Sequence, residues 1–472
     1  MVTSTSSSSN PPNHPRCQEG TLACQEYIEK LASALMEYGA PTHKLEEAIE
    51  MSSQCLGIQL ETLYIPGCML ISFGAPHIHT KAVKPAGSFL LFDLGKLKEV
   101  HDLNKEVMHN CIDIEEATAN LDAIMSRPLR YSKWWMVLFA GCASATVGPF
   151  AFEARFVDIP ILFLLGITLG LNKFHFCENI LFRNIFEIWT TCYITWLSRA
   201  FSSLAGGNLF CFSSLVQAPI ALILPGYPLL ASLLELQSKS ILAGAVRMIF
   251  ALVSSLLLGF GMTIGAALWG FNDDNTSVAM SCQQPILPMK SHGFLLNWFA
   301  ETGFAAFFTL WLCLLCQAHW KQIPMMIVMS LISHTVSFFC DLKFPSSVPI
   351  GTTVGAFILG SCGNLYSRFG YDIATAAIVP GLLVRLPAQL AAMSSLLVGL
   401  DSTDQITNVT TYENGTSTTY ITINDGNESN NLVFNVGYSM IQVAIGVAFG
   451  LMLSNCLINS FSWRRRGGVF SF

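Results

Sequence analysis

Long apolar segments fill most of the chain after residue 133 and limit what it can fold into. About ten of them come near the roughly 20 residues that a helix needs to cross a bilayer. They run approximately over Trp134 to Phe152, Val157 to Leu171, Asn184 to Leu204, Leu209 to Leu234, Ile241 to Trp269, Phe294 to Cys316, Ile323 to Cys340, Ser346 to Tyr366, Tyr371 to Leu400 and Leu432 to Ile458. Charged residues make up only 12% of the 472 residues, against roughly 25% in a soluble domain. The sequence therefore predicts a polytopic α-helical membrane protein.

The first part of the chain differs, because charged residues crowd into it and are sparse afterwards. Residues 1–20 are rich in serine and proline and contain no apolar run, so we expect them to be disordered and not to act as a signal peptide. Over residues 21–130, helical spacing of apolar residues gives way to two strand-like runs beside Pro66-Gly67 and then returns. A further strand is expected over Ser88 to Phe92. We predict a small cytosolic α+β domain.

The distribution of lysine and arginine predicts the orientation of the spans, because these residues favour cytoplasmic loops. They are more frequent on the cytoplasmic side when the N-terminus is placed in the cytosol. The Asn-x-Ser/Thr sequons, which accept N-glycans in the secretory pathway, all fall in the two longest loops of the opposite side, over 271–292 and 401–431. These are Asn275, Asn408, Asn414 and Asn427. We predict cytoplasmic termini, with a tail over 461–472, in the plasma membrane or an endomembrane.

Two Pro-Gly pairs interrupt apolar segments at corresponding places in the two halves of the membrane part. They are Pro225-Gly226 in LILPGYPLL and Pro380-Gly381 in AAIVPGLLV. A proline removes a backbone donor from a helix, and backbone loosened at membrane depth must face protein or water. Five spans over 134–270 and five over 293–460 each carry the pair in their fourth span. An odd number of spans inverts the second set, so we predict two inverted five-helix repeats with a substrate-binding site at the breaks.

Ionisable residues inside predicted spans are further candidates, since a charge at membrane depth requires compensation. Arg385, five positions after Pro380, can bind a carboxylate with its planar guanidinium. It can equally form a structural ion pair with Glu301 or Asp372. Glu301 is the candidate for proton or cation coupling, because a desolvated carboxyl group holds its proton near neutral pH. His334 could relay protons, although a hydrogen bond between helices is the interpretation we favour.

Three stretches resemble the threonine/serine exporter (ThrE-like) family. They are ALMEYGAPTHKLEEAIEMSSQCLGI (Ala34 to Ile58), DLGKLKEVHDL (Asp93 to Leu103) and LPGYPLLASLLELQSKSILAGAVR (Leu224 to Arg247). The segment GYDIATAAIVPGLLVRLP (Gly370 to Pro387) is similar to the family's second membrane domain. The resemblance implies a cytosolic domain followed by two fused five-span membrane domains that export small amino acids. The long loop from Asp401 to Asn431 departs from the family pattern.

The resemblance also draws attention to charges near the first break. Glu235 and Arg247 belong to the family-like segment and lie toward the predicted cytoplasmic end, where a gate or a fold-stabilising pair is as good an interpretation as a substrate contact. Glu187 and Arg199 flank the third span, and we expect them to extend their charged groups to its polar ends.

We predict a secondary transporter of small amino acids such as threonine and serine, coupled to protons and acting in a lipid bilayer. A dicarboxylate transporter of the same architecture is one alternative. A membrane-anchored protein whose N-terminal domain is hydrolytic, with residues such as Asp93 and His101, is another. No nucleotide-binding loop, zinc-type cysteine pairing or disulfide framework is visible, so we expect no enzyme activity, cofactor, metal or nucleic-acid partner. Assembly into a homo-oligomer stays open.

Overall fold

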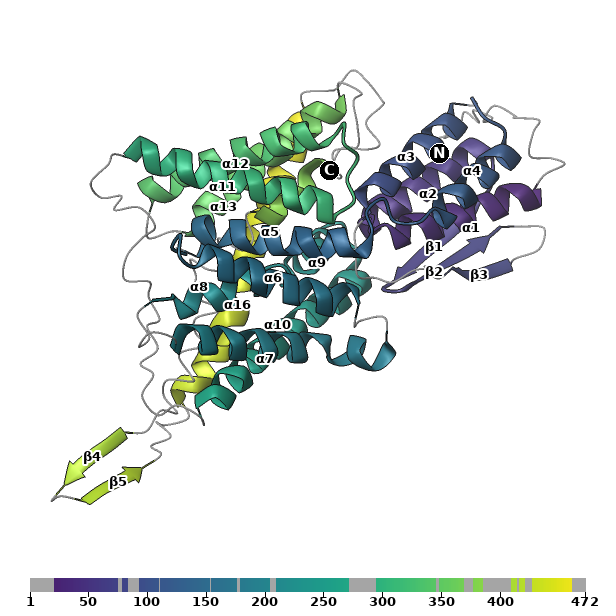
Figure 1. Cartoon of the computed structure of the whole chain (residues 1–472). Helices are drawn as coiled ribbons and strands as arrows, with labels where there is room; N and C mark the ends of the chain where they lie inside the picture. The colour runs from purple at the N-terminus through teal and green to yellow at the C-terminus, as the bar shows by residue number, and fades with distance from the viewer. Residues whose placement is uncertain are drawn as a thin grey trace, which may run out of the picture. The chain divides into compact units, whose positions relative to one another are not determined.

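A computed structural model describes residues 21–74, 79–83, 93–109, 111–152, 154–175, 179–203, 209–270, 294–344, 348–368, 377–384, 409–413, 416–420 and 427–460 (Figure 1). The chain divides into two compact units, Met1–Pro128 and Leu129–Phe472. We call them the first and second unit. Each has its own buried core, and each is described by itself.

The first unit combines helices with a small sheet. Its elements are α1 (Thr21–Glu37), α2 (Thr42–Leu56), β1 (Leu60–Ile65), β2 (Cys68–Phe73), β3 (His79–Val83), α3 (Leu94–Met108) and α4 (Ile114–Ser126). The sheet has the order β1-β2-β3 and is antiparallel, with Leu60 opposite Phe73 and Met69 opposite Val83. The helices and the β1–β2 hairpin lie where the sequence pattern predicted them. We did not predict β3, and the strand expected over Ser88 to Phe92 lies outside the described residues.

Local backbone and packing explain why these elements form. Gly39, Gly57 and Gly67 have φ values of 84°, 74° and 87°, which suit glycine where two helices and a strand end. The apolar positions of α3 that recur at helical spacing, from Leu94 to Val107, are all buried. Deep in the core, the Asn104 side-chain oxygen accepts hydrogen bonds from the Tyr27 hydroxyl at 3.1 Å and the Ser52 hydroxyl at 2.9 Å.

Asp93, a residue of the hydrolytic alternative, has a structural role in this unit. Asp93 caps α3, because its carboxylate accepts a hydrogen bond from the Lys96 backbone N–H at 2.8 Å. Within the described part of the chain, no three His, Cys, Asp or Glu side chains come together as a metal site. A hydrolytic role for this unit therefore gains no support from geometry.

His101 on α3 predicts a pH dependence of the first unit. Burial, helped by the positive charge of Lys105, lowers the pKa of His101 from 6.5 to about 4. The unfolded chain takes up a proton between these values while the folded chain stays neutral. The free energy of unfolding should therefore be constant above pH 6.5 and fall by about 3 kcal/mol between pH 6.5 and pH 4.

Pulse proteolysis of the purified full chain in urea, scored on the first unit at pH 7 and pH 5, measures this loss. His101→Leu should flatten the pH dependence. His109→Leu, which changes an exposed histidine just after the same helix, should leave it as in the wild type. An equal drop in all three proteins would contradict the assignment.

In its described residues, the second unit forms helices and one hairpin. Its helices are α5 (Lys133–Ala151), α6 (Ile159–Phe174), α7 (Ile180–Ser203), α8 (Phe212–Ile220), α9 (Gly226–Gln237), α10 (Ile241–Gly270), α11 (Phe294–Leu315), α12 (Ile323–Lys343), α13 (Val348–Arg368), a helical stretch over 377–384 and α16 (Asn427–Ser460). Among the described residues, five helices are long and apolar enough to cross a membrane, namely Lys133–Ala151, Ile241–Trp269, Trp298–Leu315, Ile323–Lys343 and Ile441–Ile458. These support a multi-pass membrane protein, and the number of ten spans remains a prediction.

Contacts between helix ends show which ends lie together. The Arg130 guanidinium donates to the Ala318 carbonyl, and the Trp134 and His175 rings are in contact at a tilt of 45°, with 4.6 Å between their centroids. We call this the Arg130 end. At the other end of α5, Arg155 donates to the Leu209 carbonyl at 2.7 Å, and we call this the Arg155 end. At each end, the loops that lie together are loops that the sequence assigned to the same side of the membrane: the cytoplasmic side at the Arg130 end and the opposite side at the Arg155 end.

Glycines let the helices of this unit approach closely. Pairs spaced four residues apart lie at three interfaces: Gly166 and Gly170 of α6 against α5, Gly261 and Gly265 of α10 against α7, and Gly351 and Gly355 of α13 against α12. A methyl group added at Gly170 would lie 2.9 Å from the Val137 Cα atom. Small residues at this spacing are typical of helix packing in membranes, where backbones touch directly. The last helix, α16 (yellow in Figure 1), packs on α13, α9 and α10.

A hairpin stands where the sequence predicted a loop over 401–431. Strand β4 (Val409–Glu413) pairs antiparallel with β5 (Thr416–Tyr420), and α16 begins at Asn427 rather than at Leu432. Valine, threonine and tyrosine, which make up most of both strands, favour such structure. Asn427 is thus the first residue of a helix, while Asn275, Asn408 and Asn414 lie outside the described residues.

Candidate functional site

The first Pro-Gly pair marks an interrupted helix in the middle of the second unit. Helix α8 ends at Ile220, the chain turns through 221–225, and α9 begins at Gly226 with Pro225 as its N-cap. Pro225 offers no N–H to the Ala221 carbonyl, and Pro219 likewise leaves the Leu215 carbonyl without its helical donor. All nine residues of α8 are buried. The predicted break at Pro225-Gly226 is therefore confirmed, and the helix that leads to it is buried in protein.

The second Pro-Gly pair behaves differently from the prediction. Residues 377–384 are all helical, so the chain does not leave the helix at Pro380-Gly381. A proline can stay in a helix when neighbouring helices and local adjustments compensate for the lost hydrogen bond. Gly381 packs closely, because a methyl group there would lie 2.9 Å from the end of the Leu359 side chain. Arg385 lies just outside the described residues, so its role remains a prediction.

Both Pro-Gly segments share the same buried clusters. Ile220 and Ala221, at the end of α8, belong to a core that also contains Phe308 of α11 and Val384. Leu230 of α9 belongs to a second core with Ile378, Leu382 and residues of α12, α13 and α16. The two segments are thus built into one interior, although only the first interrupts its helix.

Polar side chains line the helices next to Gly381. The hydroxyls of Thr309 on α11 and Ser330 on α12 lie 3.1 Å apart, and Ser330 also lies beside Gly381. His334 is buried one turn further along α12, with its ring edge on Phe150 of α5 at 5.9 Å between centroids. Glu301 lies on α11 and is partly exposed. Sequence reasoning missed Thr309 and Ser330, because a hydroxyl in an apolar segment carries no signal of what it faces.

Glu235 and Arg247 form a buried ion pair between α9 and α10. A Glu235 carboxylate oxygen lies 2.8 Å from an Arg247 guanidinium nitrogen, with side chains 0% and 14% exposed. The short turn between the helices and Gly244, where a methyl group would meet the Ser232 carbonyl at 2.7 Å, bring the two charges together. Tyr227, at the start of α9, interacts electrostatically with both.

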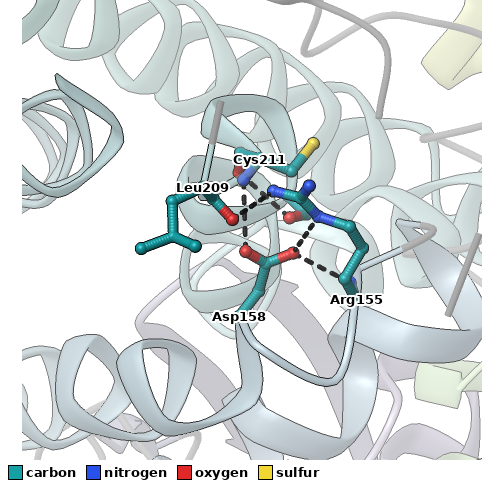
Figure 2. Close-up of polar contacts among 5 residues, drawn as sticks. Arg155, Asp158, Leu209 and Cys211 are labelled. Atoms are coloured by element: carbon teal, nitrogen blue, oxygen red, sulfur yellow. Dashed lines mark hydrogen bonds and ion pairs between the residues drawn. The ribbon is translucent and has the colours of Figure 1, made fainter. Parts of the chain in front are cut away.

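A second polar network lies at the Arg155 end (Figure 2). Asp158 is completely buried, and its carboxylate accepts hydrogen bonds from the Arg155 backbone N–H at 2.8 Å and the Cys211 N–H at 3.1 Å. The Arg155 guanidinium in turn donates to the Leu209 carbonyl. Cys211 is also disulfide-bonded, which the sequence did not suggest. These contacts tie the α5–α6 connection to the start of α8.

Arg199 corrects another expectation. We expected this residue of α7 to extend toward a polar end of its span, but only 4% of it is exposed, and its guanidinium carbon lies 5.9 Å from the centre of the Phe212 ring. Its charge thus faces the first turn of α8. The sequence pattern cannot distinguish an arginine that extends to the polar end of its span from one that is buried against another helix, because the difference depends only on which helix covers α7.

The groove between α5, α6 and α11 is unsuited to a polar solute. It has a volume of about 570 Å³ and is lined by apolar surface, including Phe163, Phe307 and Trp311. The Thr146 hydroxyl in its wall is bonded to the Cys142 carbonyl of its own helix. An amino acid would find no hydrogen-bond partner there.

Comparison with known families covers nearly all of the membrane part. A profile described as "Putative threonine/serine exporter" matches residues 26–269, and one described as "Threonine/Serine exporter, ThrE" matches residues 301–457. The chain belongs to the threonine/serine exporter family. The resemblance drawn from the sequence is confirmed.

Relatives with this fused arrangement occur in fungi. The chain is 40% identical over 454 residues to an uncharacterized protein of Schizosaccharomyces pombe, covering 96% of this chain and 57% of the relative. It is 39% identical over 451 residues to pheromone-regulated membrane protein 10 of Candida albicans, covering 95% and 39%. The chain therefore spans less than two thirds of the length of either relative. No solved structure matches it.

Proposed function

We propose that the chain is a secondary transporter of small amino acids such as threonine and serine, working by alternating access. The observation that carries the proposal is the interrupted helix α8–α9, buried inside the helical bundle of an exporter-family chain. The positive dipole end at the start of α9 suits the carboxylate of an amino acid. Thr309, Ser330 and His334 offer hydrogen-bond partners for the rest of such a solute.

The contacts between helices support an internal repeat. Suppose that α5, α6, α7 and α10 correspond, in order, to α11, α12, α13 and α16. The contact between α5 and α6 then corresponds to the contact between α11 and α12. In the same way, the α6–α7 contact corresponds to the α12–α13 contact, and the α7–α10 contact corresponds to the α13–α16 contact. Each of these contacts is present. Gly265 of α10 and Gly450 of α16 each lie against a backbone carbonyl of the partner helix, that of Cys192 on α7 and that of Thr353 on α13.

We propose that the Glu235–Arg247 pair gates the path at the Arg130 end, which we assign to the cytosol together with both termini. The excess of lysine and arginine on that side supports this orientation. The disulfide at Cys211 supports it too, because disulfides persist in oxidising compartments. Glu301 and His334 are the proposed groups for proton coupling, and Arg385 is proposed to hold the solute carboxylate.

Transport by proteoliposomes tests the function. The full chain should accumulate radiolabelled threonine or serine when a pH gradient is imposed, and a protonophore should abolish the accumulation. Succinate in place of both amino acids would favour the dicarboxylate alternative, and no flux with any of them would refute the transporter. Unchanged flux and affinity in Arg385→Ala would remove that residue from the site.

Glycosylation tests the orientation. The protein expressed in a eukaryotic host should lose apparent mass on glycosidase treatment. A variant with glutamine at Asn275, Asn408, Asn414 and Asn427 should already have the lower mass. Modification of none of these sites would leave the orientation dependent on the charges and the disulfide.

A further inference from the structure

A glutamine in a left-handed backbone conformation follows the end of α11. Gln317 has a φ of 56°, which is uncommon for residues other than glycine. Such backbone strain persists only where the surroundings hold it, and it clusters at functional sites. Gln317 and the next residue, Ala318, are 1% and 0% exposed. Because glycine would adopt this backbone without strain, what glutamine adds here is its side chain.

The Gln317 side chain binds the segment that leads into α5. Its oxygen accepts a hydrogen bond from the Tyr131 backbone N–H at 3.2 Å, and its nitrogen donates to the Met136 sulfur. Beside it, the Arg130 guanidinium donates to the Ala318 carbonyl at 3.2 Å. These bonds join the start of the first predicted repeat to the α11–α12 turn of the second.

Aromatic contacts extend this junction toward the interrupted helix. The Tyr131 ring meets the ring of Trp320 edge to face, with 6.1 Å between centroids. We call the contacts of Arg130 and Tyr131 with residues 317–320 the latch. Cys316, which directly precedes Gln317, is 8% exposed and interacts electrostatically with Tyr227 at the start of α9. The latch therefore lies next to a residue that senses the start of α9.

A turn of the same backbone form lies at the Arg155 end, between α5 and α6. The Asp158 N–H donates to the Arg155 carbonyl and the Gln322 N–H donates to the His319 carbonyl, each at 2.9 Å, and an Ile-Pro pair follows in both turns. In the α5–α6 turn, the side chains of Arg155 and Asp158 bond the segment just before α8, within the same predicted repeat (Figure 2). The bonds of the α11–α12 turn instead cross to the other repeat.

We propose that the latch closes the Arg130 end of the bundle during transport and releases Arg130 and Tyr131 when that end opens. The proposal rests on the proposed alternating access, in which one repeat moves against the other. Three hydrogen bonds and a ring contact are individually weak, so they can break and form again in each cycle. Gln317 would thus be a gating residue that acts without touching the solute.

Alkylation of Cys316 by a maleimide in the purified full chain measures opening, and tandem mass spectrometry identifies the modified thiol. Gln317→Asn introduces a residue that tolerates the left-handed backbone but is one methylene too short to keep both contacts. Cys316 should react roughly 5- to 30-fold faster in this variant, as expected when one or two hydrogen bonds are lost. Cys313, three residues earlier and completely buried, should stay protected.

Tyr131→Phe is the matched control. It keeps the ring and the backbone N–H, and it removes a hydroxyl that has no hydrogen-bond partner in the described part of the chain. Its labelling and its serine flux should match the wild type. Arg130→Gln, which changes the other side of the latch, should expose Cys316 as Gln317→Asn does. Gln317→Asn should also transport serine more slowly.

Three results would overturn the proposal. One is wild-type protection of Cys316 in both Gln317→Asn and Arg130→Gln. Another is faster reaction of Cys313 together with Cys316, which would indicate general destabilisation. The third is wild-type serine flux in a Gln317→Asn protein whose Cys316 is exposed. Failure of the wild type to transport any amino acid would instead refute the proposed function.

Discussion

Replacing Gly265 with leucine should prevent the second unit from folding stably. A Cβ atom there would lie 2.9 Å from the Thr195 Cβ atom and closer still to the Cys192 carbonyl oxygen, so α7 and α10 would have to separate. The obstacle is backbone, which cannot rotate away. Overpacking usually costs about 1 to 3 kcal/mol, and more where backbones must move. Fluorescence-detected size exclusion after heating should show a fall in melting temperature or the loss of a monodisperse peak.

Gly259 provides the control on the same helix. A Cβ atom added there would meet nothing within 4 Å. Gly259→Leu changes the same residue type in the same way, and alanine or leucine even favours a helix over glycine. Its melting temperature should match the wild type or exceed it. Equal damage from both substitutions would contradict the close packing of α7 on α10.

Removing one partner of the Glu235–Arg247 pair should have the second large effect. Arg247→Ala leaves a buried carboxylate without its cation, and Glu235→Ala leaves a cation against α9. Breaking a buried ion pair in this way typically costs about 3 to 5 kcal/mol. We expect a large drop in melting temperature in each single variant and loss of transport. Because the double variant buries no single charge, it should recover part of the stability but no gating.

The exposed ion pair between Glu99 and Arg127 provides a comparison for the loss of stability expected at the buried pair. Its atoms are also 2.8 Å apart, but the side chains are 28% and 55% exposed. An exposed pair contributes about 0 to 1 kcal/mol. Arg127→Ala should therefore change the stability of its unit little. A double-mutant cycle at Glu235 and Arg247 with no coupling would contradict the gate.

Helix positions could be predicted from the sequence because they depend on local composition. The first span was expected over Trp134 to Phe152 and is found over Lys133–Ala151. Glycines also ended helices where their freedom at positive φ allows it, as at Gly57. The β4–β5 hairpin was missed, since short runs of polar residues resemble the sequence of a solvated loop.

Partners across helices could not be predicted, because they depend on which faces meet. Glu235 and Arg247 could be assigned to the ends of neighbouring spans, but only the tight α9–α10 packing brings them to 2.8 Å. Arg199 has the same sequence surroundings as a residue facing a polar boundary, yet α8 covers it. Pro380 was expected to break a helix by analogy with Pro225, although the surrounding helices keep 377–384 helical.

The packing of α16 has a consequence for how the protein is made. This helix ends at Ser460, yet it contacts α9 and α10, which come from the middle of the chain. During synthesis α9 and α10 are complete long before α16 leaves the ribosome. Until α16 is made, the surface of α9 and α10 that it covers in the folded protein therefore lacks its packing partner. Chains that stop before Asn427 should be held by membrane quality control, even though the α8–α9 break and the Glu235–Arg247 pair are already present in them.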